Sequence, residues 1–173
     1  MMVFENEIAK IVDLLPALTD QAGNSFAIKF QYGNQADLAE YLTKAGKQSF
    51  PLIWLVNSED VHSEEGEKLV TRNNAQLIFL SETQVTAEMN PYQWMNDFDK
   101  ILQPIVDNFI KVMQNSVRGE FDFTEFTSQR VPRYHMGTQQ KDLVYICNAI
   151  TLSANITFYY NRCLRTNIFK NGN

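Results

Sequence analysis

The sequence is poor in the residue types that small enzymes commonly use for chemistry. It holds two histidines and two cysteines in 173 residues. His62 and His135 stand in polar stretches without a Cys or Ser in a recognisable frame, so we expect solvated loop histidines. Cys147 and Cys163 form no CxxC or metal-spaced set and are expected to be reduced, packed thiols. No GxGxxG, Walker A, HExxH or GxSxG motif occurs. We therefore expect no enzyme activity, no cofactor and no metal.

The composition also disfavours membrane and nucleic-acid partners. No run approaches the ~18 apolar residues that a membrane-spanning helix needs. The first residues, MMVFENEIAKIVDLL, lack a basic region before an apolar stretch, so no signal peptide is expected. With 15 basic and 20 acidic residues, the formal charge of -5 opposes a surface built to grip DNA or RNA. Hydrophobic residues at 45% and charged residues at 20% are typical of a single globular domain.

Helical spacing of apolar residues marks two long segments and one short one. The first helix is predicted over residues 3–18. A second, with a capping Asn and a Pro at its start, is predicted over about residues 90–117. Pro104 lies inside this second helix and should kink it or split it in two. The stretch ADLAEYLTKA, residues 36–45, predicts either a short helix closed by Gly46 or part of a looping connection.

Four shorter segments have the composition of strands. Alternation predicts one strand that starts at Phe26 and stops at Gly33. The apolar runs FPLIWLV (50–56) and AQLIFL (75–80) predict strands buried on both faces. EFDFTEF (120–126) predicts an amphipathic strand, followed by a polar connection over Gln129–Gln140.

The stretch NAITLSANITFYYNRC predicts a strand of unusual length. A strand over Ala149–Tyr160 would reach about 40 Å, roughly twice the ordinary length. Its apolar residues should pack under the helix of residues 90–117. Its other face is small and polar, which suits a surface covered by another chain, and we expect the Tyr159–Arg165 end to contribute to an interface. The polar residues are Thr151, Ser153, Asn155, Thr157 and Tyr159.

The order of these elements predicts the fold class and the domain organisation. It indicates an α+β fold: a mostly antiparallel sheet flanked by an N-terminal helix and one long helix. We expect a single domain over residues 1–173. Within it, residues 57–74 should form a mobile loop or arm, and residues 164–173 a final edge or a flexible tail.

Two clusters of charged residues are candidate sites. The acidic side chains of the arm at residues 57–74 could hold a cation beside Lys68, as in a metal-dependent hydrolase. The spacing of these side chains fits no EF-hand loop, so we expect a solvated loop or interaction arm instead. Arginines and tyrosines near the last two strands could stack on nucleic acid, form ion pairs at the sheet edge, or anchor a protein interface. The acidic composition favours ion pairs over nucleic acid. The interface candidates are Glu59, Asp60, Glu64, Glu65, Glu67, Tyr159, Tyr160, Arg162 and Arg165. Arg130, Arg133 and Tyr134 belong to the same basic and aromatic group.

The succession of these pieces resembles a known family over about residues 3–163. The PLIWL strand with its acidic arm and the helix NPYQWMNDFDKILQPIVDNFIKVM followed by an amphipathic final strand are similar to bacteriophage tail-completion and tail-terminator proteins. The resemblance implies a homo-oligomeric ring, typically hexameric with twelve-fold rings as an alternative, in the virion at the junction of tail tube and neck. Such rings assemble in the host cytoplasm, cap the tube and join tail to head, and DNA passes through without being read. It also implies that the arm at residues 57–74 contacts a neighbouring subunit.

Two other functions are compatible with the same residues. A cytoplasmic protein-binding module, such as an adaptor or immunity-type protein, would form one discrete complex and no ring. A metal-dependent hydrolase built on the acidic arm would respond to Mg²⁺ or Mn²⁺.

Overall fold

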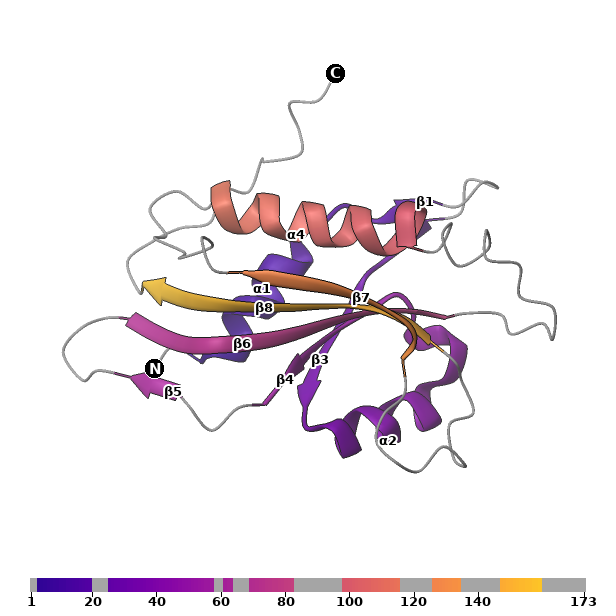
Figure 1. The fold of residues 1–173 in the computed structure, drawn as a ribbon, viewed down its shortest axis with the longest axis horizontal. Helices are drawn as coiled ribbons and strands as arrows, with labels where there is room; N and C mark the ends of the chain where they lie inside the picture. Colours follow the sequence, from indigo (N-terminus) through magenta and orange to yellow (C-terminus); the bar gives the residue numbers. More distant parts are fainter. Residues whose placement is uncertain are drawn as a thin grey trace, which may run out of the picture.

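A six-stranded sheet forms the centre of the protein (Figure 1). The computed structural model describes residues 3–19, 25–57, 61–63, 69–82, 98–115, 126–134 and 147–159. Within these residues the strand order is β3-β4-β6-β8-β7, and β5 pairs with β6 beside this path. The α+β class predicted from sequence is confirmed. The strands are β3 (Lys29–Gly33), β4 (Leu52–Val56), β5 (Val61–Ser63), β6 (Leu69–Glu82), β7 (Thr127–Tyr134) and β8 (Cys147–Tyr159).

The sheet is mostly antiparallel, as expected. Among the described strands, β3 and β4 make the one parallel pair, and a parallel pair requires a crossover connection. Helix α2 (Gln35–Ala45) supplies it, which confirms the helical alternative for this stretch. Asn34 caps the start of α2 in a capping box with Asp37, and Gly46 ends it with a φ of 61°. A separate two-stranded ribbon joins β1 (Leu18–Thr19) to β2 (Ser25–Phe26).

The two central strands, β6 and β8, are the longest of the described strands. They pair from Leu69 opposite Tyr159 to Glu82 opposite Cys147. A bulge between Arg72 and Ala75 interrupts this ladder. The strand predicted over residues 75–80 therefore begins earlier, within the segment predicted as an arm. The long final strand is confirmed for residues 147–159.

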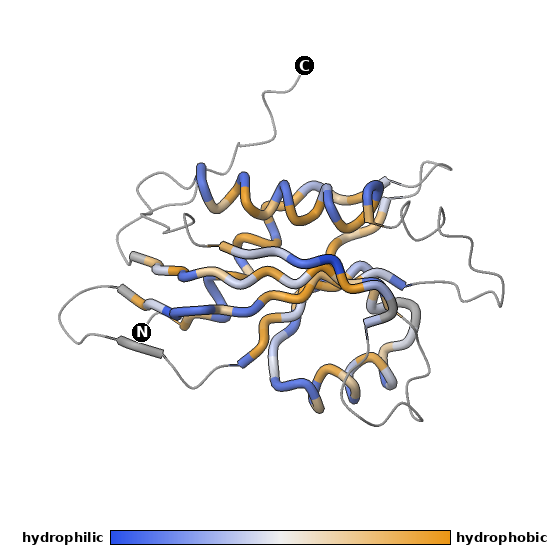
Figure 2. Tube along the Cα trace, in the orientation of Figure 1, coloured by the Kyte–Doolittle hydropathy of each residue, from blue (hydrophilic) through white to orange (hydrophobic). Residues whose placement is uncertain are grey.

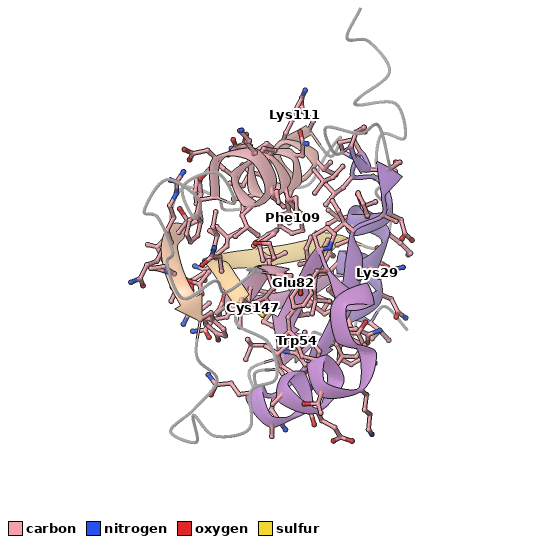
Figure 3. All side chains as sticks on the ribbon, turned by 90° about the vertical axis from the view of Figure 1, so that its right-hand side faces the viewer. Lys29, Trp54, Glu82, Phe109, Lys111 and Cys147 are labelled. Carbon is pink, nitrogen blue, oxygen red and sulfur yellow. The ribbon has the colours of Figure 1, made fainter. Side chains whose placement is uncertain are left out.

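Helices α1 and α4 cover one face of the sheet. Helix α1 (Phe4–Asp13) ends before Pro16, which accounts for its being shorter than the predicted 3–18. Helix α4 (Gln103–Asn115) follows a π-helical turn, η2 (Phe98–Leu102), so the predicted irregularity at Pro104 is confirmed at its first turn. Both helices turn apolar residues toward the sheet (Figure 2). Phe109 points from α4 to the strands and meets Phe79 edge-on, with ring centroids 5.6 Å apart (Figure 3).

The opposite face is covered by a helix at one end. There α2 packs Leu38 and Leu42 on Leu52, Trp54 and neighbouring residues of β4, β6 and β8. Figure 1 shows α2 beneath one end of the sheet, whereas α4 runs along most of its length on the other side. The two faces therefore differ in how much of the sheet a helix covers.

The prediction of a polar connection over residues 129–140 is wrong for its first part. Residues Thr127–Tyr134 form strand β7, which pairs with β8. Pro132 lies in this strand at a register shift between Val131 and Tyr134. A proline is tolerated here because no described strand pairs with the other side of β7. Residues 120–125, predicted as a strand, lie outside the described residues.

Candidate interaction surface

The part of the sheet that α2 leaves uncovered is lined by uncharged polar side chains. We call this surface the neutral face. Three adjacent strands contribute to it, because side chains alternate between the two faces along each strand. Its members are half-buried or exposed: Thr71 and Gln76 from β6, Thr127 and Gln129 from β7, and Thr151, Ser153, Asn155 and Thr157 from β8.

The boundary between the apolar and polar parts of this side crosses β6, β8 and β7 with a step of one residue pair. On the apolar side, Ala149 of β8 lies between Leu80 of β6 and Val131 of β7. On the polar side, Ser153 lies between Gln76 and Thr127 in the same way. Between these two levels, Thr151 of β8 lies between the buried Ile78 of β6 and the exposed Gln129 of β7, so the apolar part extends one pair further on β6 than on β7 and β8. The neutral face is therefore a continuous surface that the register of the strands assembles from separate segments.

Hydrogen bonds between strands hold one end of the neutral face. The hydroxyl oxygens of Thr71 and Thr157 are 3.0 Å apart, within hydrogen-bond distance across β6 and β8. At the bulge, the backbone N–H of Asn74 donates to Oδ1 of Asn155 at 2.8 Å. Asn74 has a φ of 52°, a conformation that asparagine tolerates better than most residues. These bonds fix the side chains of this end on a rigid sheet.

The middle row of the neutral face has unused hydrogen-bonding groups. Within the described part of the chain, the side chains of Gln76, Ser153 and Thr127 make no hydrogen bond to protein. Gln76 and Thr127 are exposed and Ser153 is half-buried. Hydroxyl and amide groups both donate and accept hydrogen bonds. This row can therefore bind a partner surface, but it offers no titratable group for acid–base chemistry.

On the side of the sheet that α1 and α4 cover, Arg130 forms an ion pair near the surface. Arg130 of β7 pairs with Asp99 at 2.9 Å and donates to Gln103 at 3.0 Å, and its guanidinium lies 5.6 Å from the ring of Phe98. This agrees with the ion-pair interpretation of the basic cluster for Arg130. The side chains involved are about half exposed, so the pair contributes little to stability.

A buried arginine joins α1 to the bulge of β6. Arg72 is 2% exposed, its Nη2 donates to Glu5 at 2.7 Å, and its guanidinium lies 4.4 Å from the ring centre of Phe4. Its Nε and Nη1 have no hydrogen-bond partner among the described residues. A charge at this depth is costly unless it is paired, so Glu5 is its main compensation.

No described group combines the features of a catalytic centre. Cys147, at the start of β8, is free, and its side chain is buried on the α2 side of the sheet, near Glu82 (Figure 3). Burial, with a smaller contribution from the Glu82 charge, raises the pKa of this thiol to about 12. A thiol with that pKa is protonated at neutral pH and is a poor nucleophile. Among the described residues, no group of three or more His, Cys, Asp or Glu side chains could hold a metal ion.

Raising the pH above about 9 is expected to destabilise the fold through Cys147. The thiol has an ordinary pKa of 9.0 and a folded-state pKa of about 12, so the unfolded chain loses its proton first. The stabilisation is complete below pH 9 and is lost as the pH rises toward 12, by up to about 1.4 kcal/mol per pH unit. Urea unfolding between about pH 8 and pH 10.5 measures this slope.

The matched variant for this measurement is Cys147→Ala. The protein with Cys147 and the Cys147→Ala variant both carry Cys163→Ser, so that the two differ only in the Cys147 thiol. Burial also raises the pKa of Tyr134, and that contribution has the same sign and stays in both proteins. The difference between their slopes therefore reports Cys147. Equal slopes above pH 9 would contradict the raised pKa.

Most of the interface residues proposed from sequence lie outside the described residues. This holds for the five acidic residues of the arm and for Tyr160, Arg162 and Arg165. For Tyr159 the structure gives the backbone, which pairs with Leu69 at the end of β8. These predictions, and that of a mobile arm, stay predictions. Val61–Ser63 and Leu69–Asn74 within the predicted arm are strand residues.

The sequence pattern pointed to half of the neutral face and missed the other half. The alternation of β8 indicated its polar side directly. The other residues gave no such signal: Gln76 stands in a run interpreted as a strand buried on both faces, Gln129 in a stretch interpreted as a polar connection, and Thr127 between two predicted segments. Their place beside Ser153 and Thr151 follows from strand register, which is set by residues distant in sequence.

No protein-family model matches this chain, and no curated protein matches its sequence. No helix in the described part of the chain is both long enough and apolar enough to cross a membrane.

Proposed function

We propose that this protein is a structural subunit of a tailed-phage virion. In this role it associates into a ring at the junction of tail and neck, caps the tail tube and joins tail to head while DNA passes through. The observation that carries the proposal is the neutral face, a rigid sheet surface that no described helix covers and whose described side chains offer contacts without chemistry. The kind of assembly comes from the resemblance of the order of sequence elements to tail-terminator proteins.

Two features of the molecule support a role in assembly. A sheet surface with cross-strand hydrogen bonds keeps its shape when a partner binds, which lowers the cost of association. The formal charge of -5 keeps a protein that lines a channel from adhering to passing DNA.

The proposal is tested by measuring assembly with its expected partners. The protein is purified alone and co-expressed with the proteins of neighbouring genes, and mass is measured by native mass spectrometry and light scattering. We expect a closed hexameric or twelve-fold ring, alone or on a tail tube, with a central hole in negative-stain images. A monomer that also fails to bind any tail-tube or neck protein would contradict the proposal. A single discrete complex with one soluble partner would favour the adaptor or immunity-type alternative.

A further inference from the structure

We propose that the neutral face binds the neutral face of a second copy of this chain across a two-fold axis near Ser153. The inference rests on the proposed function in one respect, since both require the chain to associate with itself. A two-fold contact does not close a ring by itself, so it would act in addition to the head-to-tail contact of a ring. It names a surface and an occupant that can be tested on the purified protein.

Charge is the first reason to choose a second copy as the occupant. Each copy has a formal charge of -5, so two copies repel one another over most approaches. The described side chains of the neutral face carry no charge. Two copies that meet there bury no unpaired charge and bring no like charges together. Because the face lacks cations, it offers no grip for nucleic acid, and because it lacks a large apolar patch, it offers none for a lipid surface.

Hydrogen-bonding chemistry is the second reason. A surface of carboxylates accepts hydrogen bonds, and a surface of ammonium groups donates them, so neither complements itself. Hydroxyls and amides do both. The side chains of the central row, Gln76, Ser153 and Thr127, can therefore form hydrogen bonds with an identical row. Within the described part of the chain these side chains make no hydrogen bond.

The size of the neutral face sets the strength of the contact. It extends about 20 Å along β8 from Thr151 to Thr157, and about 10 Å across three strands. The area that these two lengths enclose is smaller than the ~800 Å² per partner that stable complexes bury. We therefore expect a weak dimer whose population rises with protein concentration. The oligomeric state should be measured over a wide concentration range.

Opposite charges placed at Ser153 provide the test. Ser153 lies between Gln76 and Thr127 at the centre of the neutral face, so near a two-fold axis it faces its own copy. Sedimentation velocity from micromolar to near-millimolar concentration should detect a dimer of the unmodified protein. Ser153→Lys and Ser153→Asp should each raise the dissociation constant about tenfold or more, since like charges then meet. An equimolar mixture of the two variants should recover the dimer, because opposite charges meet.

The matched controls are Gln114→Lys and Gln114→Asp. Gln114 is exposed on α4, which lies on the other side of the sheet, and the same charges there should leave the dissociation constant unchanged. Because Ser153 is half-buried, Gln76→Lys and Gln76→Glu repeat the experiment at an exposed position of the same row. Thermal unfolding verifies that each variant folds.

Three results would overturn the inference. The first is an unmodified protein that stays monomeric over the whole concentration range. The second is that charges at Ser153 and Gln76 change the dissociation constant no more than charges at Gln114 do. The third is that the mixture of oppositely charged variants fails to recover the dimer. The two proposals fail separately. Ring assembly on a tail tube with no effect of charges at Ser153 rejects this contact alone. A dimer that behaves as expected without any binding to tail or neck proteins rejects the phage function alone.

Discussion

Replacing Glu5 by alanine is expected to lower the free energy of unfolding by about 3–5 kcal/mol. Glu5 is the one hydrogen-bonding partner of Arg72 among the described residues, and the guanidinium is 2% exposed. Without Glu5 this cation stays buried with no compensating charge. Urea unfolding at neutral pH measures the loss.

Glu7→Ala is the control for this measurement. Glu7 lies in the same first turn of α1, its side chain is 17% exposed as that of Glu5 is, and it pairs with the exposed Lys10. Like Glu5→Ala, this substitution removes a favourable acidic charge near the N-terminus of α1, which is worth up to about 1 kcal/mol. It also removes an exposed ion pair. A loss for Glu5→Ala no larger than for Glu7→Ala would contradict the role assigned to the buried arginine.

The reverse substitution, Arg72→Met, is expected to have a much smaller effect, within about 1 kcal/mol in either direction. It removes the buried cation together with two nitrogen atoms that have no described partner, while Glu5 is close enough to the surface to be solvated. Adding Glu5→Ala to Arg72→Met should then cost little more, so the two substitutions are strongly non-additive. Equal losses for Glu5→Ala and Arg72→Met would show instead that the ion pair itself stabilises the fold.

Replacing Gly33 by alanine is expected to destabilise the protein by about 4 kcal/mol, from backbone strain and overpacking together. Gly33 has a φ of 154°, which side chains other than hydrogen rarely allow. An added Cβ would lie 2.8 Å from Cβ of Asp37 and 2.9 Å from Cζ2 of Trp54. Neither atom can move far, because Asp37 belongs to the capping box of α2 and the Gly33 carbonyl accepts from Trp54 Nε1 at 3.1 Å.

Gly46→Ala serves as the matched control for Gly33. Gly46 also has a positive φ, 61°, with a ψ of -151° at the end of α2, a conformation essentially limited to glycine, where alanine costs roughly 1–3 kcal/mol. Chemical unfolding of both variants separates the strain of a positive φ from the steric conflict at Gly33. If Gly33→Ala costs no more than Gly46→Ala, the close approach of Asp37 and Trp54 does not constrain this turn.

Local patterns in the sequence predicted the elements whose signal lies within one segment. Gly46 marked the end of α2, Pro104 marked the change from π-helix to α-helix, and alternation marked β8. Each signal reflects a short-range constraint, namely a backbone conformation, a missing donor or a period of two. Strand β7 was missed because its polar residues and Pro132 resemble a loop. At a sheet edge, both are compatible with a strand.

The sequence by itself determined the α+β class, the two faces of the final strand and the lack of recognisable catalytic motifs. It did so because burial imposes a helical or strand period on neighbouring residues. The tertiary structure alone decided that Gln76, Ser153 and Thr127 form one row, and that Arg72 of β6 meets Glu5 in the first turn of α1. These contacts join residues far apart along the chain, and the register that aligns them is set by the packing of the whole sheet between its helices.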